Sequence, residues 1–139
     1  MDCRFCDITT QAGQIIREGE HTIVFLSKPR LMPGHLLVIP KRHAEKLSDL
    51  TKEERAELFN EAAQLQEKVL EMIAPGCDVS QHFRPFIPDS RFKQAHLHVH
   101  IRPRALEDEL YEKSQKFEND IFMDPSEEEL EKYKNLFNN

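Results

Sequence analysis

The stretch His96-Leu97-His98-Val99-His100 constrains the fold of this chain more than any other feature. Successive side chains of a strand point to opposite faces, so this alternation places three imidazoles on one side. The apolar side chains of the stretch then take the other side: Leu97, Val99 and Ile101. Apolar residues fill a buried face at lower cost than histidines do, and we therefore interpret the row as a functional site.

Strand and helix signals alternate along the first three quarters of the chain. Apolar runs bounded by turn residues predict five strands, at residues 14–17, 22–26, 35–39, 78–87 and 96–102. Thr51-Lys52-Glu53-Glu54 is a capping box, and apolar residues recur at helical spacing from Leu58 to Met72. This long helix packs on a sheet or on a partner. Because short turns join the strands, we expect an α+β fold with a mostly antiparallel sheet.

Residues 105–139 differ from the rest of the chain in charge. They hold 11 acidic and 4 basic side chains, a balance of −7, which leaves +1 for residues 1–104 within the net charge of −6. The acidic segment predicts two helices, the second with Asp124 as N-cap and Pro125 as its first residue. We expect residues 1–104 to form a catalytic domain and residues 105–139 to form a helical extension packed on it.

Charge and hydropathy exclude several classes of partner. The body of the chain does not repel an anionic substrate, whereas the acidic segment disfavours a nucleic-acid backbone, so we expect a small anionic ligand and no nucleic acid. No apolar run is as long as a membrane span, and the N-terminus lacks the charged-then-apolar order of a signal peptide. With three cysteines and no need for a disulfide framework, the chain is expected to be cytoplasmic, with no membrane partner.

Cys3 and Cys6 form a C-x-x-C pair, which occurs in metal sites and in redox sites. The redox version usually opens a helix inside a βαβ unit, and the predicted elements contain no such unit. A metal is therefore the better interpretation. Zinc needs four ligands, so two thiolates require two more, for which histidine is the obvious residue. The alternative is a pair of buried cysteines without metal.

Three motifs occur in an order that resembles one protein family. They are Cys3-Arg4-Phe5-Cys6, the segment from Pro33 to His43 and the segment from His96 to Arg104. Together they resemble the histidine-triad (HIT) family of nucleotide hydrolases and transferases. The resemblance implies a HIT-like five-stranded antiparallel sheet with one long helix, and a homodimer that packs this helix across a two-fold axis. The apolar stripe from Leu58 to Met72 is compatible with that packing.

The resemblance also implies roles for single residues. His43 and His96 complete a structural zinc site with Cys3 and Cys6, which ties the N-terminal segment to the triad strand. His98 is then the nucleophile, because a neutral imidazole attacks an α-phosphorus and leaves a nucleotidyl-histidine that water cleaves.

His100 and His35 take supporting roles beside that nucleophile. His100 orients the loop or hydrogen-bonds phosphate oxygens, and nucleotidyltransferase relatives typically carry Gln at its position, so His100 favours a hydrolase. His35 resembles the family histidine that lies beside the triad and orients the nucleophile; the alternative is a surface histidine at a strand end.

Two further sets of residues resemble substrate contacts of the family. The positions of the base pocket hold apolar residues that a core would also contain: Phe5, Ile8, Phe25 and Leu26. Ser27 stands where many relatives have an Asp that holds the ribose. The loop before the triad lacks the usual Gln and hydroxyl, and cations are available to replace them through charge-assisted hydrogen bonds. These cations are Arg84, Arg91 and Lys93, which are otherwise solvated loop charges.

These observations favour a zinc-containing HIT-like hydrolase that cleaves nucleotides next to the α-phosphate. Its substrate is a nucleoside phosphoramidate, a dinucleoside polyphosphate or an adenylated metabolite. One alternative is a zinc-stabilised nucleotide-binding or regulatory module with little turnover. Another is a metal-dependent hydrolase whose metal is held by all three triad histidines.

Overall fold

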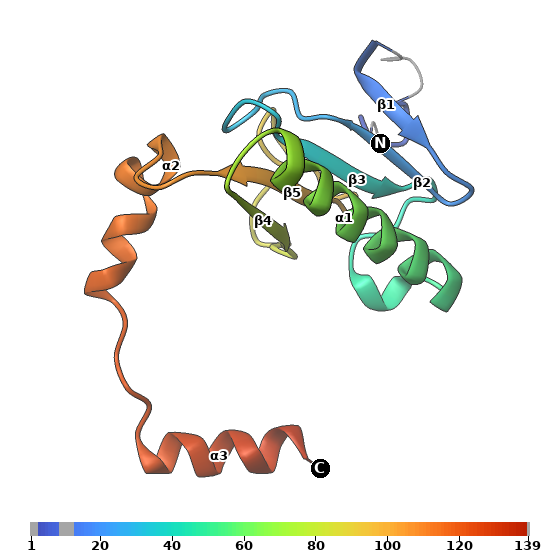
Figure 1. Ribbon diagram of the computed structural model, residues 1–139. Helices are drawn as coiled ribbons and strands as arrows, with labels where there is room; N and C mark the ends of the chain where they lie inside the picture. The colour runs from blue at the N-terminus through green and yellow to red at the C-terminus, as the bar shows by residue number, and fades with distance from the viewer. Residues whose placement is uncertain (1–2, 9–12, 139) are drawn as a thin grey trace. The chain divides into compact units, whose positions relative to one another are not determined.

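The computed structural model describes residues 3–8 and 13–138. The chain divides into two compact units, residues 1–106 and residues 107–139, and each is described by itself. The first unit contains the sheet, the long helix and the histidine row (Figure 1). No helix within the described ranges combines the length and the apolar composition needed to cross a bilayer.

One five-stranded antiparallel sheet forms the centre of the first unit, which confirms the predicted fold class. Its strands and the long helix are β1 (Ile15–Glu18), β2 (Thr22–Leu26), β3 (Leu36–Pro40), α1 (Lys52–Met72), β4 (Gly76–Gln81) and β5 (Val99–Arg104). The spatial order is β1-β2-β3-β5-β4. Helix α1 carries the chain from β3 to the far edge, so β5 is inserted between β3 and β4 and is paired on both sides.

Helix α1 covers one face of the sheet (Figure 1). The predicted capping box fixes its start, because Thr51 Oγ1 accepts a hydrogen bond from Glu54 N and Glu54 Oε1 accepts one from Thr51 N. The apolar stripe is buried against the protein's own sheet through Leu58, Ala62, Leu65 and Val69. Of the stripe considered for a dimer contact, only Met72 lies at the surface, with 71% exposure. The stripe therefore serves the core of the chain itself.

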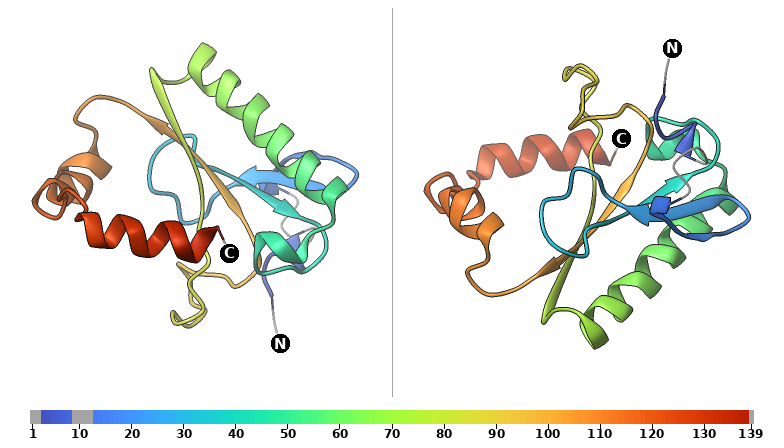
Figure 2. Two further views of the ribbon diagram at one scale, coloured as in Figure 1. Left: turned by 90° about the horizontal axis from the view of Figure 1, so that it is seen from below. Right: turned by 90° about the horizontal axis from the view of Figure 1, so that it is seen from above.

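The two faces of the sheet carry separate apolar clusters, as the alternation of side chains along each strand requires. On the helix face, α1 packs on Val24, Val38 and Val99. On the other face, the N-terminal residues 3–8 pack on the alternate set: Ile23, Phe25, Leu37 and Ile39. Figure 2 shows α1 and this N-terminal segment on opposite sides of the sheet. His100 pairs with Leu37, so its side chain shares the second face.

The triad strand begins later than predicted. β5 starts at Val99, whereas the alternation predicted a start at His96. The reason is that the preceding residues bond to the end of β3 and to the segment after it: His96 Nε2 donates to Pro40 O at 2.8 Å, and Leu97 N donates to Ala44 O at 2.6 Å. These contacts move His96 out of the sheet and toward the loop that holds His43.

β4 is shorter than the predicted strand 78–87, for a related reason. It ends at Gln81, which pairs with Val99, the first residue of β5. Residues beyond Gln81 have no strand opposite them and form a loop. The predicted alternation nevertheless holds across the start of β5, because its apolar members all enter the helix-face cluster: Leu97, Val99 and Ile101.

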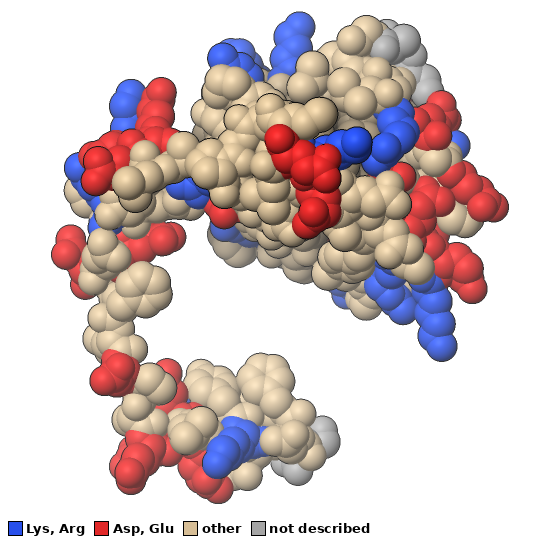
Figure 3. All heavy atoms as spheres, in the orientation of Figure 1, with Lys and Arg blue, Asp and Glu red and all other residues tan. Residues whose placement is uncertain are grey.

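The second unit contains α2 (Glu109–Lys113), a 3-10 helix η3 (Gln115–Asp120) and α3 (Glu127–Phe137). Figure 3 shows acidic side chains spread along it. The predicted N-cap of the last helix is wrong, because the cap is Ser126 and not Asp124. Ser126 and Glu129 form a reciprocal capping box that satisfies two backbone N–H groups. The packing of this extension on the first unit stays a prediction.

Candidate active site

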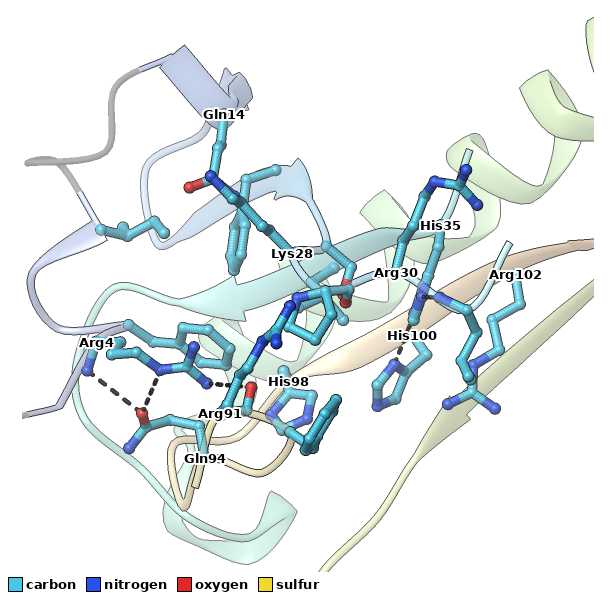
Figure 4. Close-up of a pocket in the computed structure, with 18 residues that line it drawn as sticks. Arg4, Gln14, Lys28, Arg30, His35, Arg91, Gln94, His98, His100 and Arg102 are labelled. Atoms are coloured by element: carbon cyan, nitrogen blue, oxygen red, sulfur yellow. Dashed lines mark hydrogen bonds between the residues drawn. The ribbon is translucent and has the colours of Figure 1, made fainter. Parts of the chain in front are cut away.

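A pocket of about 240 Å³ is formed on the sheet face opposite α1 (Figure 4). Its walls come from the N-terminal segment, β2, the loop between β2 and β3, the loop before the triad, and β5. The pocket brings together most of the predicted substrate and catalytic residues: Phe5, Ile8, Phe25, Ser27, His35, Arg91, His98 and His100. Segments far apart in the sequence therefore meet at one cavity.

Three predicted contacts lie outside this pocket. Leu26 is 43% exposed and does not line it, because its neighbour Phe25 takes the inward position and the strand alternates. Arg84 and Lys93 line a second, smaller pocket beside His96. Of the three loop cations considered for phosphate binding, only Arg91 reaches the main pocket.

The apolar wall of the pocket is also core. Phe5, Ile8 and Phe25 are buried in the cluster on this face of the sheet. These residues are therefore both part of the core and part of the pocket wall. The Phe5 ring packs edge-on against Phe25 and against His98, with ring centroids 5.3 Å apart in both cases. Ser27 is engaged within its own loop, since its hydroxyl donates to Pro29 O at 2.8 Å.

A single hydrogen bond decides which nitrogen of His98 is reactive. His98 Nδ1 lies 2.7 Å from the carbonyl oxygen of His96. A carbonyl only accepts, so Nδ1 carries the proton. The neutral ring then has its lone pair on Nε2, the nitrogen that a nucleophile needs, and the ring lines the pocket.

His35 and His100 form a chain of donors with a fixed direction. Leu31 N donates to His35 Nδ1 at 3.2 Å, so this nitrogen is unprotonated and the neutral ring carries its proton on Nε2. His35 Nε2 then donates to His100 Nδ1 at 2.9 Å. His100 is thereby left with its proton on Nε2, as a hydrogen-bond donor in the wall of the pocket.

These histidines are neutral at physiological pH. Burial, together with the nearby positive charge of Arg102, lowers the pKa of His35 to about 4 and the pKa of His100 to about 2. Burial also lowers the pKa of His98, against the opposing effect of its bond to the His96 carbonyl. The tautomers of His35, His98 and His100 require neutral rings, and burial keeps these rings neutral.

The predicted metal ligands form a second cluster. Cys3, Cys6, His43 and His96 each place one ligand atom within 4.8 Å of all the others. Cys6 Sγ lies 3.3 Å from His43 Nδ1 and 3.5 Å from His96 Nδ1, and Cys3 Sγ lies 3.4 Å from His96 Nδ1. Tetrahedral zinc, with bonds of about 2.3 Å to sulfur and 2.0 Å to nitrogen, separates these atoms by about 3.5 Å. The donor set and its spacing fit zinc.

Hydrogen bonds with the backbone around this cluster orient the ligand atoms. His96 Nε2 donates to Pro40 O, so its Nδ1 lone pair points at the two sulfurs. Cys3 Sγ accepts a hydrogen bond from Cys6 N at 3.3 Å, which fixes the sulfur beside His96. The metal-ligating groups found among the described residues contain neither His98 nor His100. The histidine row is thus divided between two sites.

Several pocket residues were not predicted from the sequence. Gln94 is buried and accepts hydrogen bonds from Arg4, so an amide from the loop before the triad does reach the pocket. Arg102 continues the row of side chains on the face of His98 and His100, and extending the alternation by two residues would have found it. Three other polar residues line the pocket but belong to no sequence motif: Gln14, Lys28 and Arg30.

The sequence matches the HIT domain over residues 9–106. The chain belongs to the HIT family. It is 32% identical over 108 residues to the Protein hit of Bacillus subtilis, covering 74% of this chain and 71% of that protein. It is also 31% identical over 99 residues to the asymmetrical bis(5′-nucleosyl)-tetraphosphatase of Schizosaccharomyces pombe, covering 69% of this chain and 52% of that protein. This HIT chain therefore spans about half the length of the yeast tetraphosphatase.

Solved structures of HIT proteins share the fold. A HIT protein of Bacillus subtilis superposes with a TM-score of 0.71 at 22% identity, covering 99% of this chain and 95% of the other. A zinc-bound histidine-triad protein of Mycobacterium smegmatis gives a TM-score of 0.65 at 28% identity, covering 79% of this chain and 80% of the other.

Proposed function

We propose that the protein is a hydrolase of small nucleotides that cleaves at the α-phosphate through a covalent nucleotidyl-histidine on His98. The observation that carries the proposal is the bond from His98 Nδ1 to the His96 carbonyl, which leaves Nε2 as a nucleophile in the pocket. Relatives with named activities act on nucleotides. They include the yeast tetraphosphatase and the adenosine 5′-monophosphoramidase of Schizosaccharomyces pombe, which is 29% identical over 113 residues.

In the first step, His98 Nε2 attacks the α-phosphorus and the bond to the leaving group breaks with its electron pair. The imidazole gains positive charge as the phosphorus–nitrogen bond forms. The His96 carbonyl dipole, still bonded to Nδ1, stabilises that charge. In the second step, water attacks the phosphorus and releases a proton to solvent, while the electrons of the phosphorus–nitrogen bond return to Nε2. The neutral ring is restored, the nucleoside monophosphate is released, and an amine leaving group has taken up a proton from solvent.

His100 supports both steps as a donor. Its Nε2 proton, fixed in place by the chain from Leu31 through His35, is available to a phosphate oxygen on which negative charge develops. His35 acts through His100 and is a positioning residue. The apolar wall of Phe5, Ile8 and Phe25 suits the base of the nucleotide.

We further propose that Cys3, Cys6, His43 and His96 bind one structural zinc ion. The spacing of their donor atoms supports this, and so does the zinc-bound relative from Mycobacterium smegmatis. The metal would supply a rigid tetrahedral link between the N-terminal segment and the triad. Homodimerisation is proposed from the family resemblance alone, and a cytoplasmic location is proposed from the cysteine content of the sequence.

Intact-protein mass spectrometry after rapid quenching with adenosine 5′-phosphoramidate tests the proposed intermediate. We expect an adenylyl adduct on the wild type and no adduct on His98→Ala. Turnover of the same substrate should fall by roughly four orders of magnitude in His98→Ala, because a chemical route and not a contact is removed. His100→Ala should cost less.

The control is His21→Ala, which removes a histidine that does not line the pocket and should leave turnover unchanged. Retention of more than a few per cent of the activity in His98→Ala would exclude His98 as the nucleophile. Nucleotide binding without turnover or adduct in the wild type would favour a regulatory binding module instead.

A further inference from the structure

Arg102 is a partly buried cation at one end of the pocket. It follows His100 by two residues on β5 and lines the cavity beyond it. Its Nε atom is buried and has no hydrogen-bond partner among the described residues. A guanidinium is always charged, and leaving it partly buried without a counterion is costly. Such a group in a ligand pocket indicates that the ligand brings the missing anion.

The carboxylate that faces Arg102 across the two strands is bonded to another arginine. Asp78 of β4 stands directly opposite Arg102 in the strand register. Its Oδ2 atom, however, accepts a 2.5 Å bond from Arg104 Nη1. Burial lowers the pKa of Arg102, against the opposing attraction of Asp78.

A second unpaired polar atom lies beside Arg102. Ser80 of β4 pairs with His100, so its side chain points to the same face of the sheet. Its Oγ is buried and also has no hydrogen-bond partner among the described residues. Two neighbouring strands therefore each present an unpaired polar group next to the His100 end of the row.

The charges that line the pocket are of one sign. Its basic residues come from four different segments, and no Asp or Glu is among the described residues that line it. The basic residues are Arg4, Lys28, Arg30, Arg91 and Arg102. Figure 4 shows His98, just before β5, followed by His100 and Arg102 on the strand, with Gln94 and Arg4 on the other side of His98. An anion that extends from His98 past His100 thus reaches Arg102.

We propose that Arg102 binds the part of the substrate that departs, and that the enzyme selects nucleotides whose leaving group is a phosphate chain over nucleotides that lose an amine. This inference rests on the proposed function. When His98 attacks the α-phosphorus, the bond to the bridging oxygen breaks and that oxygen keeps the electron pair. The departing phosphate chain thereby gains negative charge, which Arg102 neutralises. Ammonia leaving from a phosphoramidate offers no such charge.

The experiment compares kcat/KM for diadenosine tetraphosphate and for adenosine 5′-phosphoramidate in the wild type and in Arg102→Leu. One lost charge-assisted contact corresponds to a factor of about 10 to 100. We therefore expect Arg102→Leu to lower kcat/KM for the tetraphosphate at least about tenfold more than for the phosphoramidate. Arg102→Lys, which keeps the charge without the planar fork, should restore part of the preference.

Two controls separate this role from a structural one. Arg17→Leu removes a cation that is paired with Glu61 outside the pocket, and it should leave the ratio of the two substrates unchanged. The melting temperature of Arg102→Leu should be equal to or above that of the wild type, because an unpaired buried charge is removed. An equal loss of both activities together with a lower melting temperature would overturn the proposal.

If the protein is not a nucleotide hydrolase, the same experiment gives a different result. If the wild type cleaves neither compound, hydrolysis of these two substrate classes is excluded, and calorimetric titration with ATP and AMP then decides the role of Arg102. The wild type should bind ATP more tightly than AMP, and Arg102→Leu should lose that preference. An unchanged preference in the variant would refute the inference about Arg102 alone.

Discussion

His35 and His100 have their low pKa values because they are buried, and this ties the stability of the protein to pH. The side chain of His35 is 3% exposed and its pKa is about 4, whereas an unfolded histidine titrates near 6.5. Between these values the unfolded chain binds a proton that the folded chain does not. The free energy of unfolding therefore falls as the pH falls from about 6.5 toward 4.

His35→Gln tests this linkage. The amide of Gln can still donate to His100 but does not titrate. Between pH 7 and pH 5 we expect the wild type to lose about 1–2 kcal/mol more than the variant, measured by urea unfolding. The metal cluster is common to both proteins and cancels in the difference. Equal losses would mean that His35 keeps an ordinary pKa in the folded protein.

Sequence reasoning worked best for residues whose neighbours form a repeating pattern. Strand alternation placed His98 and His100 on one face, and the family motifs named Cys3, Cys6 and His43. It failed where a side chain's place depends on how a loop folds back. Lys93, for example, pairs with Asp89 and turns away from the main pocket.

Helix α1 packs on its own sheet through the part of its apolar stripe from Leu58 to Val69. Leu58 has no exposed surface, whereas Leu70 on the same helix is 43% exposed. Leu58→Ala should therefore lower the free energy of unfolding by about 2–5 kcal/mol, because it removes buried methyl groups and leaves a cavity. Urea unfolding of Leu70→Ala, with an expected loss below about 1 kcal/mol, is the control. Similar losses in both variants would show that the helix packs through a different face.

Element types were easier to predict than element ends. The capping box at Thr51 predicted the start of α1 because its two hydrogen bonds are local in sequence. The ends of β4 and β5 depend on each other and on contacts with the segment after β3, which no local pattern contains. The cap at Ser126 was missed because Asp124 with Pro125 offered a competing local signal.

The first unit as a whole is predicted to depend on one metal ion. Elemental analysis of protein purified without added metal should find one zinc per chain. Cys3→Ala should remove it and lower the melting temperature by about 10 °C, which corresponds to a loss of a few kcal/mol for a chain of this size.

Cys77→Ala is the matched control, because Cys77 is a free cysteine on β4, outside the cluster. It should keep the zinc. A wild-type protein that contains no metal, and that Cys3→Ala does not destabilise, would exclude the site. The zinc experiment does not test the predicted homodimer. A dimer contact through the helix would have to use other residues, because the stripe from Leu58 to Val69 is buried within the chain.

The N-terminal residues 3–8 contribute to both sites, because Cys3 and Cys6 alternate along them with Phe5 and Ile8. A metal that fixes the two sulfurs therefore also fixes Phe5 and Ile8, which line the proposed site for the nucleotide base. Binding of zinc to the cluster and binding of a nucleotide in the pocket are therefore coupled, and each affects the other equally. AMP in the pocket should raise the affinity for zinc, measured by competition with a chelator, and removal of the zinc should weaken AMP binding by the same factor. Metal supply would then set how strongly the protein senses nucleotides.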